Sequence, residues 1–481
     1  MLTVLLIIVP LFFSLCIFFV KNKAVVRNLA LISSLISLMI VICEAFFFDK
    51  SPVYNFYINL PWITSLGVNL EFGLDGIGFL LVMLVSFAMP LIILSSFSTD
   101  YASTGNFYGL ILLMQSALIG VFSSLDGLLF YIFWELALVP IYFICLAWGG
   151  ENRIKITFKF FIYTLSSSLF MLVAIIYLYT LTPEQHTFSL SIIYKLALSE
   201  NQQDWIFWAF LLAFAVKIPI FPFHSWQPDT YTVAPAPGSM LLGGLMSKMG
   251  LFGVLRFIIP LCPVALKNYG FYVIIFAISG LLYGAIIAIK QGELKRLIAF
   301  SSLSHVGLMA AALFTMDSKA LSGSVLQMVS HGINVIGLFF IADVISLRMK
   351  TTRIESLGGI AKSAPKLAIF FMIVMLANVA LPLTSGFVGE FLMLAGLFSY
   401  NMIIAGIAGL SIIFGAVYMF WLYQKTIYGP SNELSAQFKD LSPIEMLIAI
   451  PIVVAIFTIG LYPALITSFS ASTIQHLLSF R

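Results

Sequence analysis

The chain has 481 residues, of which 61% are hydrophobic and 9% are charged, and its formal net charge is +4. Charged residues make up roughly a quarter of an ordinary soluble domain, so this composition excludes that class. Apolar runs of roughly 18 or more residues recur along the chain, which indicates membrane-spanning helices and excludes the short alternating strands of a barrel. We therefore expect an all-α polytopic membrane protein.

The apolar runs predict about 14 transmembrane helices. Their expected ranges are 2–20, 28–48, 76–97, 106–123, 126–147, 157–181, 205–231, 236–261, 270–289, 294–316, 320–346, 365–397, 401–424 and 444–470. The seventh and twelfth are long and contain helix breakers, so we expect both to be broken, although simple kinks are an alternative. The breakers are Pro219, Pro222 and Pro228 in the seventh, and Pro382, Ser385, Gly386 and Gly389 in the twelfth.

The basic residues predict the orientation. Of the 24 lysines and arginines, 16 fall in loops after odd-numbered spans, and five fall in loops after even-numbered spans or at the C-terminus. By the positive-inside rule the first set of loops is cytoplasmic, so we expect both termini on the periplasmic side of a bacterial inner membrane. Lys217, Lys248 and Arg256 fall within spans. Arg256 lies near the end of its span and is expected to reach the interface.

A weak internal repeat suggests the domain organisation. The segments AVKIPIF (215–221) and NVALPLT (378–384) share a proline-containing core. Spans 4–8 and 9–13 would then form two five-helix repeats, and an odd number of spans gives consecutive repeats opposite topologies. The expected division is residues 1–100 for helices 1–3, 101–264 for the first inverted repeat, 265–428 for the second, and 429–481 for helix 14.

Six ionisable residues lie within the predicted spans and are the candidate site. They are Glu135, Lys217, Lys248, His305, His331 and Glu390. Each charge near a bilayer centre costs about 2.5 to 3.5 kcal/mol on insertion scales, so such a set requires a function or partners. Burial favours a neutral lysine and a nearby carboxylate favours a charged one, so a Glu135/Lys217 pair whose separation changes would load and release a proton. The other four, with water held at the helix breaks, could pass the proton on.

Simpler interpretations exist for these residues. Glu135 and Lys217 could form a static ion pair. His305 and His331 could be core histidines bonded to serines, or they could ligate a haem.

Other features limit the chemistry of this chain. The four cysteines occur singly in apolar segments, so we expect no iron–sulfur cluster and no zinc site. Nucleotide-binding loops and hydrolase motifs are also absent from the sequence, so the chain cannot supply its own energy source. Glu71 and Asp75, just before the third span, are expected to be interfacial caps.

Five segments carry a family resemblance: FYIFWELALVPIYF, FAVKIPIFPFHSWQPDTYTVAP, ELKRLIAFSSLSHVG, MVSHGIN and SGFVGEF. Over about residues 70–425 the chain resembles the antiporter-like membrane subunits of respiratory complex I, in particular the M type, whose mitochondrial counterpart is NADH dehydrogenase subunit 4. Two features favour the M type. The chain stops after the predicted span 14, without the lateral helix of L-type subunits, and Glu390 stands where L-type and N-type subunits tend to have a lysine.

The resemblance implies two inverted five-helix repeats with broken helices 7 and 12, and one proton channel in a proton-translocating NADH:quinone oxidoreductase. It implies that Glu135 and Lys217 are the coupling pair, Lys248 the central relay, His305 and His331 linking groups, and Glu390 the terminal group. FMN, iron–sulfur clusters and quinone would belong to partner subunits. The expected neighbours are L-type and N-type subunits and membrane lipids, with no nucleic acid. Subunits of multisubunit cation/proton antiporters, and of membrane-bound hydrogenase or formate-oxidising complexes, share the fold and are alternatives.

Overall fold

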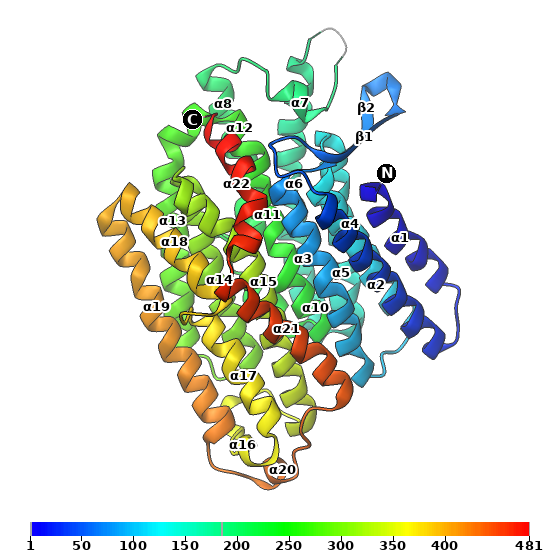
Figure 1. Ribbon diagram of the computed structural model, residues 1–481, viewed down its shortest axis with the longest axis vertical. Coiled ribbons are helices and arrows are strands. Elements are labelled where there is room, and N and C mark those ends of the chain that lie inside the picture. Colours follow the sequence, from blue (N-terminus) through cyan, green and yellow to red (C-terminus); the bar gives the residue numbers. More distant parts are fainter. Residues whose placement is uncertain (1, 184–185, 481) are drawn as a thin grey trace.

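The computed structural model describes residues 2–183 and 186–480. Its long helices lie side by side in one bundle (Figure 1). Eleven helical segments of the described chain are long and apolar enough to cross a membrane, so the protein is a multi-pass integral membrane protein. Predicted spans 1, 7 and 12 are not among the eleven, because the first helix has 16 residues and the other two are interrupted. The total of about 14 spans therefore stays a prediction.

The helices of the first part of the chain are α1 (Leu2–Ile17), α2 (Lys23–Phe47), α3 (Gly76–Ser95), η2 (Ser96–Ser98), α4 (Thr104–Ser123), α5 (Gly127–Trp148), α6 (Arg153–Leu181), α7 (Leu190–Ile193), α8 (Glu200–Lys217), α9 (Gln227–Val233), α10 (Ala236–Met240), η3 (Leu241–Met246), α11 (Ser247–Gly253), η4 (Val254–Ile258) and α12 (Ile259–Leu261). Those of the second part are α13 (Pro263–Ile289), α14 (Leu294–Phe314), α15 (Ser318–Met349), η5 (Ile354–Ser356), α16 (Ile360–Ser363), α17 (Pro365–Asn378), α18 (Ser385–Tyr400), α19 (Met402–Tyr423), η6 (Gln424–Tyr428), α20 (Glu433–Ala436), α21 (Pro443–Leu461) and α22 (Ala464–Leu478).

Both predicted helix breaks are present. α8 ends at Lys217 and α9 begins at Gln227, while α17 ends at Asn378 and α18 begins at Ser385. The first break places Lys217 in the last turn of α8, where the free carbonyl groups and the dipole of a helix favour a cation. The predicted span therefore does not carry its lysine in the middle of a continuous helix.

Two features of the fold differ from the prediction. A hairpin of β1 (Asn55–Ile63) and β2 (Val68–Leu74), joined by η1 (Thr64–Leu66), precedes α3 and pairs in antiparallel fashion. A proline inside β1, Pro61, disfavours a strand and hides it from a sequence pattern. The predicted span 444–470 is divided, because α21 ends at Leu461 and α22 begins after Pro463.

The described ends of the chain lie at the same end of the bundle as the hairpin, and α16 and α20 lie at the opposite end (Figure 1). The described ends of the chain therefore lie at one end of the bundle (Figure 1), and the placement of both termini on one side of the membrane stays a prediction. Which side faces the cytoplasm stays a prediction from the basic residues. Arg481, one of the five basic residues assigned to the periplasmic side, lies outside the described residues.

Arg256 pairs with Asp75 at the start of α3, and its predicted position at the membrane interface stays a prediction. Its side chain is buried, and its Nη1 lies 2.8 Å from Asp75 Oδ2. Asp75 also caps α3 as predicted, because its Oδ1 accepts a hydrogen bond from Gly78 N at 2.8 Å. The cap predicted for Glu71 is wrong, since this residue lies on β2 and accepts a hydrogen bond from Tyr57 Oη at 3.0 Å. η4 and the start of α3 are thereby joined by a buried ion pair.

Asp126 caps α5 at this end of the bundle. It is fully buried, and its Oδ1 accepts hydrogen bonds from Leu128 N at 2.9 Å and Leu129 N at 3.0 Å. Burial raises its pKa from the ordinary value of 3.8 to about 6, against the opposing effect of these backbone hydrogen bonds. Since the pKa of the folded state lies above that of the unfolded state, the carboxylate lowers stability as the pH rises through this range.

We expect Asp126→Asn to stabilise the protein at neutral pH. Asparagine keeps an acceptor for the two backbone amides and carries no charge. The free energy of unfolding should rise by up to about 3 kcal/mol above pH 7, and the gain should shrink as the pH falls towards 4. Thermal unfolding of the purified protein at several pH values measures this. Asp100→Asn, at an exposed carboxylate beside Lys23, is the control; a gain for Asp126→Asn that does not depend on pH would contradict the assignment.

Candidate proton-transfer site

The site is centred on Lys248, in the helix formed by α10, η3, α11, η4 and α12. Two segments of this helix, η3 and η4, are π-helical, and such segments leave some carbonyl groups without their regular partners. Lys248 is fully buried, and its Nζ donates to Gly243 O at 2.8 Å and Ser247 Oγ at 3.3 Å. The π segment thus supplies the acceptor that an amine needs inside a membrane.

His331, on α15, is the next group in the site. Its Nδ1 lies 2.8 Å from Lys248 Nζ, and its Nε2 lies 3.2 Å from the hydroxyl of Ser302 on α14. The amine therefore shares a hydrogen bond with one ring nitrogen, while the other ring nitrogen faces a hydroxyl. The predicted relay and the predicted linking histidine are in direct contact.

His305 and Glu390 continue the row. Nδ1 of His305, on α14, lies 2.8 Å from Oε1 of Glu390, on α18. The carboxylate also accepts a long hydrogen bond from Gln327 Nε2 at 3.4 Å. The ring centroids of His305 and His331 are 5.8 Å apart. Four of the six predicted residues thus form one row across α11, α15, α14 and α18, which we call the polar row.

Polar side chains that the sequence did not single out surround the polar row. Asn378 Oδ1 lies 3.4 Å from His305 Nε2 and accepts a hydrogen bond from Ser301 Oγ at 3.1 Å. Ser301 Oγ is also 3.0 Å from Tyr418 Oη. Ser301 and Ser302 stand four and three residues before His305 on α14, so they lie on the same face of the helix. This spacing is the sequence signal that could have predicted their place in the site. Since both nitrogens of each histidine face a side-chain partner, the pair does not fit the haem interpretation.

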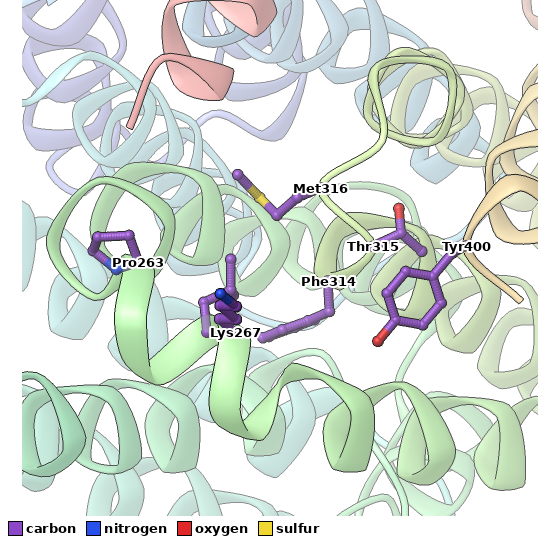
Figure 2. Close-up of a pocket in the computed structure, with 7 residues that line it drawn as sticks. Pro263, Lys267, Phe314, Thr315, Met316 and Tyr400 are labelled. Carbon is purple, nitrogen blue, oxygen red and sulfur yellow. The ribbon is translucent and has the colours of Figure 1, made fainter. Parts of the chain in front are cut away.

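Two cavities are lined by residues of α18, the helix that carries Glu390. A cavity of about 10 Å³, room for about one water, is lined by polar groups of Ser304, His305, Asn378, Glu390 and Ser411, among other residues. A larger cavity, of about 410 Å³, lies at the ends of α14 and α18. Figure 2 shows Thr315 beside Tyr400 in its wall, with Lys267 facing Phe314. The ends of the helices that carry His305 and Glu390 therefore border a cavity whose wall mixes apolar side chains with Lys267, Thr315 and Tyr400.

Glycines allow the close packing that brings Lys248 to His331. A Cβ atom on Gly332 of α15 would lie 2.9 Å from Gly244 O, and one on Gly244 would lie 2.6 Å from Ile336 Cγ1. Contacts this short do not occur between real side chains and backbone, so both positions need glycine for η3 and α15 to touch. The hydrogen bond between the amine and the imidazole depends on this contact.

Glu135 and Lys217 lie near each other without forming an ion pair. No nitrogen of Lys217 lies within 4.0 Å of a Glu135 oxygen. Lys217 Nζ lies instead 5.3 Å from the ring centroid of Trp134, a cation–π contact with the residue that precedes the glutamate. Glu135 Oε1 is buried and has no hydrogen-bond partner. The geometry does not support a static ion pair, and among the described residues no hydrogen bond links these two side chains to the polar row.

Residues 124–415 match the family described as NADH:quinone oxidoreductase/Mrp antiporter, TM. The chain belongs to this family. It is 39% identical over 459 residues to NADH-quinone oxidoreductase subunit M of Rickettsia conorii, covering 94% of this chain and 92% of that one. It is 38% identical over 473 residues to F(420)H(2) dehydrogenase subunit M of Methanosarcina mazei, covering 96% and 94%.

A solved structure of a family member gives the same fold. A chain in the structure of respiratory complex I from Thermus thermophilus with bound NADH superimposes with a TM-score of 0.91 and 31% sequence identity, covering 99% of this chain and 100% of that one. Together with the similarity to subunit M, this confirms the predicted resemblance to the antiporter-like membrane subunits of complex I. The chain is a homologue of NADH-quinone oxidoreductase subunit M.

Gly332→Ala tests the glycine contact. We expect it to lower the free energy of unfolding by about 1 to 3 kcal/mol, because the added methyl group would force η3 away from α15. Thermal unfolding of the purified protein measures this. Gly270→Ala on α13 is the matched control, since its Cβ would meet only Phe314 O at 3.5 Å. Equal effects of the two substitutions would contradict the packing argument.

Proposed function

We propose that this chain is the proton-translocating subunit M of the membrane arm of an NADH:quinone oxidoreductase. NADH oxidation and quinone reduction in partner subunits would drive it, and those subunits would hold FMN, the iron–sulfur clusters and the quinone. L-type and N-type antiporter-like subunits would be its neighbours in the membrane. The observation that carries the proposal is the polar row from Lys248 to Glu390 inside a family member's bundle.

The polar row has the chemistry of a proton relay. An imidazole can take up a proton on one ring nitrogen and release it from the other, so a histidine passes a proton without a net change. His331 faces Lys248 with Nδ1, and His305 faces Glu390 with Nδ1. Only the step between the two rings lacks a direct hydrogen bond, and a bound water or a ring rotation would close it.

Glu135 and Lys217 are the coupling pair of this proposal. Lys217 rests over Trp134 at the end of α8, so a small movement at the helix break would change its separation from Glu135. A short separation favours the charged amine and a long one favours the neutral amine. The pair would thus exchange a proton each time the partner subunits change its geometry.

The proposed topology follows the two helix breaks. The predicted spans 4–8 and 9–13 would form the two inverted repeats. The break between α8 and α9 falls in span 7 and the break between α17 and α18 falls in span 12, so the two would occupy matching positions in the repeats. The basic loops lie in the cytoplasm and both termini lie in the periplasm. Protons would enter from the basic end of the bundle and leave on the side of Glu390.

The electron donor has one alternative. A relative of almost equal identity is named F(420)H(2) dehydrogenase subunit M, so the same proton-moving role could serve a complex that oxidises that donor. Assays of the purified complex with NADH and with reduced F420 separate the two. The family description also names Mrp antiporters. Sodium-dependent proton flux in vesicles that lack the respiratory partners would favour that alternative.

We expect Glu135→Ala and Lys217→Ala each to lower NADH-driven proton pumping severalfold while the complex remains assembled, because each removes one member of the coupling pair. Proton uptake by inside-out membrane vesicles, normalised to the amount of assembled complex, measures this. Lys319→Ala, at an exposed lysine at the start of α15, is the control and should pump normally. Normal pumping by both coupling-pair variants would refute their assigned role.

A further inference from the structure

The last turn of α8 lies directly on α11, the segment that carries Lys248. A Cβ atom on Gly250 of α11 would lie 3.0 Å from Phe214 O, 3.1 Å from Ile218 N and 2.6 Å from Ile218 Cγ1. Phe214 O and Ile218 N form the hydrogen bond, 2.7 Å long, that closes this turn. Lys217 belongs to the same turn. A backbone contact therefore joins the end of α8 that carries Lys217 to the segment that carries Lys248.

Gly253, three residues further along, extends the contact. A Cβ atom there would lie 2.5 Å from Cε1 of the Phe214 ring. Residues three apart lie on the same face of a helix, so Gly250 and Gly253 together form one face of α11, and α8 covers it. A real Cβ atom does not approach other atoms this closely, so both positions need glycine for α8 to pack here.

The helix that contains α11 meets α15 on a different face. Gly244 of η3 packs against Ile336 of α15. Lys248 Nζ lies 2.8 Å from His331 Nδ1, also on α15. The part of the helix between Gly244 and Gly250 is therefore held between α15 and the end of α8. Because Lys248 stands two residues before Gly250, a displacement at Gly250 changes the position of the amine against His331.

The backbone of this helix can adjust on either side of α11. α11 has seven residues and lies between the π segments η3 and η4. The regular hydrogen-bond ladder is interrupted at a π segment, and helices bend there. The outer parts are fixed, because Ser239 Oγ of α10 donates to Tyr231 O at 2.7 Å and Arg256 Nη1 of η4 lies 2.8 Å from Asp75 Oδ2. α11 can therefore shift as a short unit within a helix whose ends stay in place.

We propose that the contact of Gly250 with the last turn of α8 transmits the state of Lys217 to Lys248. This inference rests on the proposed function, and it names the contact through which the coupling pair acts on the polar row. When Lys217 approaches or leaves Glu135, the last turn of α8 moves and displaces α11. The displacement lengthens or shortens the distance from Lys248 Nζ to His331 Nδ1, so it opens or closes the hydrogen bond between them. Gly250 is a positioning residue, since it carries no proton itself.

Gly250→Ala tests the inference, because its methyl group holds the last turn of α8 away from α11. We expect NADH-driven proton uptake by inside-out vesicles to fall severalfold per assembled complex. Gly105→Ala is the matched control, since its Cβ would lie 3.1 Å from Ile17 O, a similarly close backbone contact between α4 and α1, and its uptake should stay at the wild-type rate. The wild-type rate in Gly250→Ala would overturn the inference.

Lys217→Ala separates transmission from a merely structural defect. Without its lysine, the last turn of α8 has no charge state to transmit, so adding Gly250→Ala should cause no further loss of the residual pumping. A structural defect would lower the residual pumping by the same factor as it lowers the wild-type rate. That outcome would overturn the inference.

Ile218→Ala decides if Gly250→Ala does not assemble, because it removes the side chain that meets Gly250. A loss of pumping that appears only when Lys217 is present supports the inference. An equal fractional loss with and without Lys217, or no loss at all, overturns it.

The same measurements separate this inference from the proposed function. Loss of pumping in Lys217→Ala together with the wild-type rate in Gly250→Ala would remove the contact from the mechanism and leave the proposed function standing. Normal pumping in Lys217→Ala would remove the coupling role of Lys217, and the transmitted state with it.

Discussion

An amine buried in a membrane must find acceptors within the protein, and the hydrogen bonds of Lys248 show how this chain supplies them. A continuous α-helix uses its own carbonyl groups, so it has none to offer. The π segment η3 releases Gly243 O, and α15 brings His331 Nδ1 to 2.8 Å from the amine. The glycine contact between η3 and α15 makes the second bond possible, and the polar row continues from His331.

The two halves of the chain share a shape and differ in charge. Lys217 lies two residues before Pro219 at the first break, whereas Ala380 occupies the matching position before Pro382 at the second. The second half places its ionisable group, Glu390, inside α18, in contact with His305. The first half keeps Lys217 over Trp134 at the end of a helix. The two breaks therefore differ in their ionisable groups: the first has an amine in the last turn of α8, and the second has a carboxyl group inside α18.

The sequence predicts the elements of this protein better than their contacts. Hydropathy and the proline positions were enough to place the long helices and both breaks, and the cost of burying charge was enough to select the six ionisable residues. Three features depend on tertiary structure. The strand β1 contains Pro61, the π segments leave no hydropathy signal, and helix rotation decides that Lys248 meets His331 while Glu135 and Lys217 stay apart. Helix rotation is fixed by packing at residues such as Gly244 and Gly332.

Proton passage along the polar row is tested most directly at His331, because this residue alone touches Lys248 and faces the ring of His305. The measurement is the initial rate of NADH-driven proton uptake by inside-out vesicles that carry His331→Leu, per assembled complex. Leucine fills a similar space and can carry no proton. If protons pass along the polar row, uptake falls severalfold while assembly is retained. Uptake at the wild-type rate would contradict it.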